Sequence, residues 1–83
     1  MSDEIRALVL KIVEGLHGPY AVAKAGRLKS VTFSLDKSVW NESERPEVGQ
    51  YVILSRLRET SAGWRAKSGR FAQLSDVKQP QQQ

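Results

Sequence analysis

The chain has 83 residues, of which 40% are hydrophobic and 27% charged, and its formal net charge is +4. A chain of this length buries one modest core, and its composition is that of a globular protein rather than a disordered one. It contains no cysteine and one histidine, which excludes disulfides, thiol nucleophiles and cysteine-bound metals and argues against histidine-based catalysis. We therefore expect one domain over residues 1–77 that is not an enzyme and holds no metal or cofactor.

The first residues and the hydropathy pattern bear on where the protein works. The opening Ser2-Asp3-Glu4 is acidic, unlike the start of a secretory signal or a transit peptide. Charged side chains such as Lys11 and Glu14 interrupt the apolar stretches, none of which approaches the roughly 20 residues that span a membrane. We expect a cytoplasmic protein without a membrane partner.

Residues 5–16 carry apolar side chains at the spacing of an amphipathic helix. These side chains recur three and four positions apart and comprise Ile5, Leu8, Val9, Ile12, Val13 and Leu16. Such spacing gathers them on one face of an α-helix. Ser2 suits the N-cap, and Gly18 and Pro19 are expected to end the helix. The pattern predicts an amphipathic helix over residues 3–16.

After Pro19 the apolar positions alternate with polar or small ones, which is the period of a β-strand. The alternating side chains are Tyr20 and Val22 before the turn at Ala25-Gly26-Arg27, and Val31, Phe33 and Leu35 after it. These two segments are expected to pair as a hairpin, with Phe33 in the core. Residues 36–49 are expected to form a polar, acidic connection that Val39 and Trp40 anchor.

Two further β-rich runs, at residues 51–58 and 64–71, flank a four-residue loop at residues 60–63. They predict a second hairpin, so β-structure is expected over residues 19–74. The predicted fold class is α+β or mainly β, with the N-terminal helix packed on a four- to five-stranded antiparallel sheet or small barrel. The polar tail at residues 78–83 is expected to be disordered.

The second hairpin gathers positive charge. Its loop is expected to place Arg58 opposite Arg65 and Arg56 opposite Lys67 on one face of the sheet. Like charges that face each other across a sheet destabilise it by up to about 1 kcal/mol per pair, whereas bound phosphates neutralise such a cluster. Arg70 is expected to extend the same surface. The alternative is that these cations protect an exposed edge strand from aggregation.

A second basic group brackets the first hairpin turn and comprises Lys24, Arg27 and Lys29. Residues 19–35 carry three basic and no acidic side chains, and residues 56–72 carry five basic side chains against one acidic. Positive charge therefore concentrates in the two hairpins, which favours an anionic partner. For the first group, solvated turn residues are the alternative interpretation.

Two aromatic residues lie next to these basic segments, and the bases of single strands stack on exposed rings beside a basic groove. Tyr20 and Trp64 are therefore candidates for stacking. Trp64 shares a predicted sheet face with Leu57 and Ala66, so packing in the core is the alternative that we favour for it. His17 is expected to cap the helix end rather than to act in catalysis.

Three short segments resemble the second half of a cold-shock or related OB-type barrel. They are Val31-Thr32-Phe33, Pro46-Glu47-Val48-Gly49-Gln50 and Gly63-Trp64-Arg65-Ala66. The resemblance covers about half the chain and implies a small β-barrel that binds nucleic acid, with Phe33 and Tyr20 at positions of the stacking kind. The chain departs from that family in its predicted helix and in having a single ring near Tyr20. An SH3-like barrel or an open sheet covered by the helix fits the same pattern.

These features predict a small nucleic-acid-binding domain that uses a basic antiparallel hairpin face. The expected partner is DNA or RNA, single strands included. The predicted binding residues are Arg56, Arg58, Arg65, Lys67, Arg70, Lys24, Arg27, Lys29, Tyr20 and Trp64. The alternative is a protein-interaction module, such as an adaptor or inhibitor, that recruits a partner or a second copy of itself through the helix or a strand edge.

Overall fold

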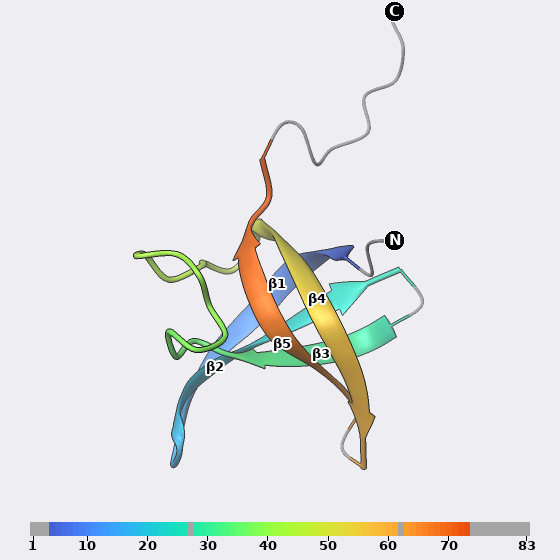
Figure 1. Ribbon diagram of the computed structural model, residues 1–83, viewed down its shortest axis with the longest axis horizontal. Coiled ribbons are helices and arrows are strands. Elements are labelled where there is room, and N and C mark those ends of the chain that lie inside the picture. The colour runs from blue at the N-terminus through green and yellow to red at the C-terminus, as the bar shows by residue number, and fades with distance from the viewer. Residues whose placement is uncertain (1–3, 27, 62, 74–83) are drawn as a thin grey trace, which may run out of the picture.

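Across residues 4–26, 28–61 and 63–73, which it describes, the computed structural model contains five β-strands. They are β1 (Ile5–Gly15), β2 (Gly18–Ala25), β3 (Leu28–Ser34), β4 (Tyr51–Thr60) and β5 (Gly63–Phe71). Neighbouring strands pair in the order β1-β2-β3-β5-β4, and β4 also pairs with β1, so the sheet closes (Figure 1). β3 and β5 run parallel, and the other pairs are antiparallel. The chain is a small closed β-barrel, consistent with the OB- and SH3-like barrels expected from the sequence.

The predicted N-terminal helix is wrong. Ile5–Gly15 is strand β1, which pairs with β2 on one side and with β4 on the other, so it is a wall of the barrel rather than a layer over it. The described residues contain no helix, and hence none that is long and apolar enough to cross a membrane. The predicted N-cap, Ser2, lies outside the described residues. The fold class is therefore corrected from a helix on a sheet to an all-β barrel.

A β-bulge explains why β1 resembles a helix in sequence. The side chains of Ile5, Ala7 and Val9 are buried in the core or packed against it, at the two-residue spacing of a strand. The register then shifts at Leu10, and Ile12 is the next side chain to contact the core. Positions 5, 9 and 12 are thus all inward, and their spacings of four and three are those of a helix face.

Both predicted hairpins are confirmed. In the first, β2 pairs with β3, and Tyr20 lies opposite Ser34. In the second, β4 pairs with β5 in the register expected from the loop, which brings Arg58 directly opposite Arg65. The tail at residues 78–83, predicted to be disordered, lies outside the described residues.

The core lies inside the barrel and combines small with large side chains. β2 contributes only alanines to it, namely Ala21, Ala23 and Ala25, which leaves room for large rings from elsewhere. Phe33 and Trp40 fill that room: they are 0% and 3% exposed, and their rings stack with centroids 5.7 Å apart. The predicted core position of Phe33 and the predicted role of Trp40 as an apolar anchor of the connection are therefore confirmed. The other buried apolar residues are Ala7, Val9, Val31, Val52, Ile53, Leu54 and Ala66.

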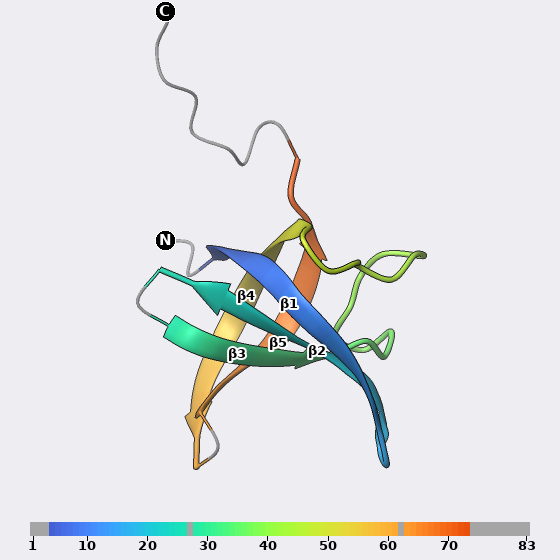
Figure 2. The ribbon, with the colours of Figure 1, turned by 180° about the vertical axis from the view of Figure 1, so that it is seen from behind.

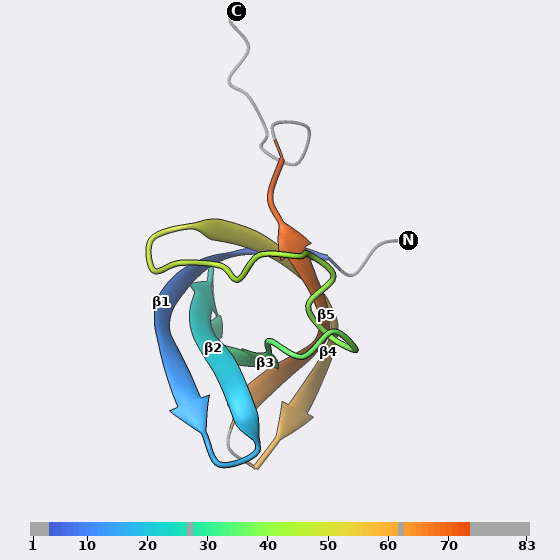
Figure 3. The same cartoon turned by 90° about the vertical axis from the view of Figure 1, so that its left-hand side faces the viewer.

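Trp40 ties the connection between β3 and β4 to the barrel, along whose rim the connection runs (Figure 3). The Trp40 ring meets the Phe71 ring edge-on at 5.0 Å, and Nε1 donates a hydrogen bond to the Glu44 carbonyl at 2.6 Å. The Trp40 backbone bridges to Gly69, where a Cβ atom would lie 3.1 Å from the indole ring. Glycine is needed here because the indole occupies the space of a side chain.

The β4–β5 hairpin changes phase at Arg56. This residue has a φ of 56°, in the left-handed region that residues other than glycine rarely adopt. Leu54 and Leu57 both contact the core although they are three residues apart, a spacing that strict alternation would place on opposite faces. The left-handed residue between them supplies the change of phase, and the side chains of Arg56 and Arg58 are both exposed.

The turns of the β1–β2 and β4–β5 hairpins project from the same end of the barrel (Figures 1 and 2). In Figure 2, β3 crosses the face of the barrel between the two projecting turns. Gly18 in the β1–β2 turn has a φ of 111° and Gly63 at the start of β5 a φ of 121°, so both turns use backbone conformations that glycine adopts easily. Two hairpin ends thus flank one outer face of the sheet.

Candidate nucleic-acid interface

A row of outward side chains crosses all five strands. In register, the row consists of Lys11 on β1, Val22 on β2, Thr32 on β3, Arg65 on β5 and Arg58 on β4. On β2, β3 and β5 the adjoining residue toward the core is buried, so the row itself lies on the outside. Residues from early and late strands of the chain therefore lie in one row on the outside of the barrel.

Beside this row lies a hollow of about 220 Å³ next to the β1–β2 turn. Its lining includes His17 from the turn, Tyr20 from β2, Ser34 from β3 and Arg65 from β5. Tyr20 pairs directly with Ser34, which places the ring and the hydroxyl on neighbouring strands of the same face. The hollow thus presents a ring, a hydroxyl, an imidazole and a guanidinium to a single ligand.

Arg58 and Arg65 face each other across β4 and β5. Both side chains are exposed, and the ion pairs found among the described residues involve two other cations, Arg45 and Arg70. Like charges in this position repel each other and cost the sheet up to about 1 kcal/mol. A phosphate removes that repulsion, because guanidinium groups bind phosphate oxygens through paired, charge-assisted hydrogen bonds.

The other two predicted hairpin cations, Arg56 and Lys67, lie two residues farther from the turn than Arg58 and Arg65. They are on opposite strands, next to the pair formed by Ser55 and Ser68, and both are exposed. All four cations that the sequence assigns to this hairpin are therefore on its surface.

Arg70 does not join this cluster. It pairs with Ile53, five residues farther along β5 than Arg65, which is roughly 16 Å at about 3.3 Å per residue. Its Nη2 lies 3.6 Å from Glu4 Oε1, and its Nη1 donates to the Phe71 carbonyl at 3.3 Å. Arg70 is thus engaged within the fold, away from the hairpin end where its extension of the basic surface was expected.

The remaining predicted residues fall in different places. Trp64 pairs with Val31 and packs against the core, which agrees with the core alternative rather than with base stacking. Lys24 is exposed on β2. Arg27 and the side chain of Lys29 lie outside the described part of the chain.

Several residues of this surface are not among the binding residues predicted from the sequence, and they include Lys11, His17 and Thr32. The omissions of Lys11 and His17 follow from the predicted helix, which makes Lys11 part of a separate layer and His17 a helix end. The β-branched content of residues 5–13, followed by Gly15 and Gly18, is the signal that favours a hairpin instead.

Comparison with known proteins does not identify a family or a function for this chain. No protein family matches the chain, and no curated protein or solved structure shows significant similarity to it. Function is therefore inferred from the geometry and the charge of the barrel itself.

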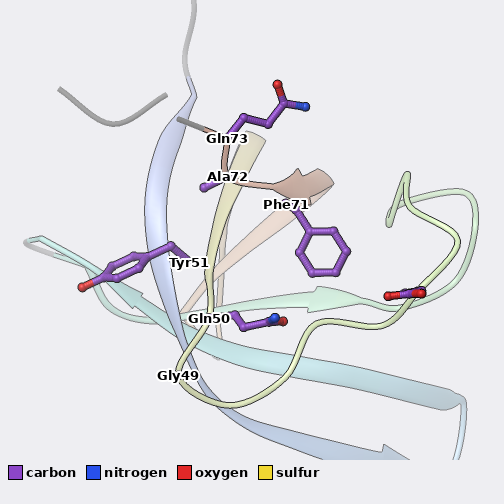
Figure 4. A pocket seen from close by; sticks show the side chains of 7 residues that line it. Gly49, Gln50, Tyr51, Phe71, Ala72 and Gln73 are labelled. Atoms are coloured by element: carbon purple, nitrogen blue, oxygen red, sulfur yellow. The ribbon is translucent and has the colours of Figure 1, made fainter. Parts of the chain in front are cut away.

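A larger hollow, of about 640 Å³, lies between the β3–β4 connection and the end of β5 (Figure 4). It is lined by Glu44, Gly49, Gln50, Tyr51, Phe71, Ala72 and Gln73. Glu44 is the one charged residue in this lining, and its carboxylate repels anions. Figure 4 shows Tyr51 directed away from Phe71, so the two rings do not clasp a common ligand. Despite its size, this hollow suits a polyanion less well than the smaller one.

Proposed function

We propose that the protein binds single-stranded nucleic acid through a basic face made of Lys11, Tyr20, Thr32, Arg58 and Arg65. The observation that carries the proposal is the direct pairing of Arg58 with Arg65 next to a hollow lined by Tyr20. The repulsion between the two arginines disappears when an anion lies over them, and the adjacent ring offers a base a surface for stacking. Phosphates and bases are common to DNA and RNA, so the proposal covers both.

We further infer that the barrel is of the OB type. OB folds are five-stranded Greek-key barrels that bind oligonucleotides on the face of strands 2 and 3 and on the loops that join strands 1 to 2 and 4 to 5. The order β1-β2-β3-β5-β4 agrees with such a barrel. The basic face includes β2 and β3 and lies next to the two projecting hairpin turns (Figure 2). Its position therefore supports the same function as its charge.

Some groups of the basic face contact phosphates, and others contact sugars or bases. Lys11, Arg58 and Arg65 neutralise phosphates, which releases condensed counterions into solution. Tyr20 stacks on a base, and the hydroxyl of Thr32 can donate to or accept from a sugar or base edge. A duplex keeps its bases inside the helix, so the Tyr20 ring favours a single strand.

No observation favours the protein-interaction alternative in the form that the sequence suggested. That form used the amphipathic helix or a free strand edge. The described residues contain no helix, and each strand of the closed barrel pairs with a neighbour on both sides over at least part of its length. The form of this alternative that relied on the helix is therefore excluded.

Fluorescence anisotropy of labelled single-stranded and duplex oligonucleotides, DNA and RNA, tests the proposal at low and at physiological salt. We expect single strands to bind more tightly than duplexes. The logarithm of their affinity should fall with the logarithm of salt concentration, with a slope of roughly 0.7 per phosphate contact. The Arg58→Glu/Arg65→Glu variant should bind at least about tenfold more weakly, since each arginine contributes charge-assisted hydrogen bonds.

Two single variants separate position from net charge. Arg65→Glu and Arg70→Glu each lower the net charge of +4 by two, but only Arg65 lies on the basic face. We expect Arg65→Glu to weaken binding and Arg70→Glu to bind like the wild type, with thermal unfolding used to show that both are folded. An affinity that does not change with salt concentration contradicts the proposal. So does an equal loss of affinity in the two variants.

A further inference from the structure

A third hollow, of about 350 Å³, lies on the outer face where β2, β1 and β4 are neighbours. Leu8 on β1 pairs with Lys24 of β2 on one side and with Tyr51 of β4 on the other. Arg6, two residues before Leu8, also lines the hollow. We call Arg6, Leu8, Lys24 and Tyr51 the Tyr51 patch, and Lys24 alone among them is one of the nucleic-acid-binding residues predicted from the sequence.

The chemistry of the Tyr51 patch resembles that of the basic face. The guanidinium carbon of Arg6 lies 4.5 Å from the centre of the Tyr51 ring, and Tyr51 is 47% exposed. Arg6 and Lys24 are both exposed, and the lining of the hollow includes no carboxylate. Single-stranded bases stack on aromatic rings and on arginine planes, while the two cations attract the phosphates beside them.

β2 connects the two surfaces. Tyr20 of the basic face and Lys24 of the Tyr51 patch lie four residues apart on the outer side of β2, which is roughly 13 Å. From Lys24, the strand spacing of about 4.8 Å brings Tyr51 within two strands, across Leu8. Single OB folds cover roughly 4 to 16 nucleotides, so one chain of nucleic acid reaches both surfaces.

We propose that a single strand longer than the basic face continues along β2 and across β1 onto the Tyr51 patch, where one base stacks on Tyr51 and Arg6. This inference rests on the proposed function and adds to it the path and the length of the bound strand. The favoured ligand is then a longer single strand, bound across neighbouring outer faces of the barrel, rather than a short oligonucleotide held in the first hollow alone.

A comparison of two lengths of the same homopolymer, about 5 and about 15 nucleotides, tests this path. Anisotropy titrations with the wild-type protein, with each affinity divided by the number of binding positions that the strand offers, should show the longer strand binding at least about fivefold more tightly than the shorter one, the gain that one stacked base brings. In Tyr51→Ala and in Arg6→Gln the affinity for the shorter strand should stay unchanged, and the gain with length should be lost.

Conservative and neighbouring variants control for indirect effects. Tyr51→Phe keeps the ring and should keep the gain with length. Val48→Ala removes a side chain that is 62% exposed and lies three residues before Tyr51, and it should behave like the wild type. A full gain with length in both Tyr51→Ala and Arg6→Gln overturns the path while the proposed function stands. Failure of the wild-type protein to bind either strand overturns the proposed function itself.

Discussion

The connection at residues 36–50 and the hairpin at residues 56–67 carry opposite charge. The connection has four acidic and two basic side chains, whereas the hairpin has four basic and one acidic. In the connection, the Asp36 carboxylate accepts hydrogen bonds from the hydroxyl and the amide of Ser38, at 2.6 and 3.2 Å. These bonds favour the ionised form and lower the pKa of Asp36. The connection thus satisfies polar groups within its own backbone and side chains.

In the hairpin, by contrast, the charged side chains of Arg58 and Arg65 are not paired with opposite charges among the described residues. These two arginines face each other across β4 and β5. Polar groups that are satisfied within the fold help to hold it together, whereas like charges held face to face on the surface are available to an external anion. The connection thus carries contacts that hold the fold together, whereas the hairpin carries exposed like charges, and the proposed function rests on these.

The largest effect is expected from removing the indole that anchors the connection. Trp40→Ala should lower the free energy of unfolding by about 3–5 kcal/mol, because it empties the space between Phe33 and Phe71. Urea denaturation measures this loss, and the folded fraction should bind nucleic acid as before. A loss below about 1 kcal/mol would contradict the structural role of the connection.

A smaller loss is expected from filling the space at Gly69. A Cβ atom there would lie 3.0 Å from Leu54 Cδ2 and 3.1 Å from Trp40 Cε3. Gly69→Ala should therefore cost about 1–3 kcal/mol of stability through overpacking. The double variant with Trp40→Ala, measured by urea denaturation, should recover part of this cost because the clashing ring is gone. Simple additivity of the two losses would show that the contact does not matter.

In the hairpin, a substitution is expected to raise the free energy of unfolding rather than to lower it. Arg65→Ala removes one partner of the like-charge pair and should raise the free energy of unfolding by up to about 1 kcal/mol while weakening nucleic-acid binding. The contrasting variant is Arg45→Ala, which breaks the exposed 3.1 Å ion pair with Glu14 and should lose between about 0 and 1 kcal/mol. Thermal unfolding and anisotropy on the same samples check both. A destabilised Arg65→Ala would remove the evidence that the arginines repel each other.

The smallest effect is expected at the left-handed residue of the hairpin. Arg56→Gly relieves a backbone cost of about 1–2 kcal/mol, but glycine in a strand itself costs about 0.5–1 kcal/mol. We expect Arg56→Gly to raise the free energy of unfolding, measured by urea denaturation, by about 0.5 kcal/mol. Arg56→Ala keeps the strain and should leave this free energy unchanged. Equal stability of the two variants would show that the left-handed conformation carries little strain.

The second hairpin and the core aromatics are predictable from the sequence because the signals are local. The turn between Thr60 and Gly63 sets the register of the strands on either side, so the pairing of Arg58 with Arg65 follows from counting outward from it. Phe33 follows from the alternation of its strand. Trp40 follows from being one of two large apolar residues in an otherwise polar connection.

Strand β1 and the full extent of the basic face are not predictable in this way. The bulge at Leu10 gives the strand the apolar spacing of a helix, and its place between β2 and β4 depends on residues up to about 50 positions away. Lys11 shares a row with Thr32 and Arg65 only because β1 pairs with β2, β2 with β3 and β3 with β5. The pairing of β1 with β4, which closes the barrel, brings Arg6 next to Tyr51.

By itself, the sequence determined the two later hairpins, the register of the second of them, the core positions of Phe33 and Trp40 and the concentration of positive charge, because turn residues and side-chain period act over a few positions. Only the tertiary structure decided that the first segment is a strand, that Arg70 stays within the fold and that one basic face draws on all five strands. The physical reason is that strand pairing and core packing join residues far apart in the chain, and their combined free energy outweighs the local preference of residues 5–16 for a helical pattern.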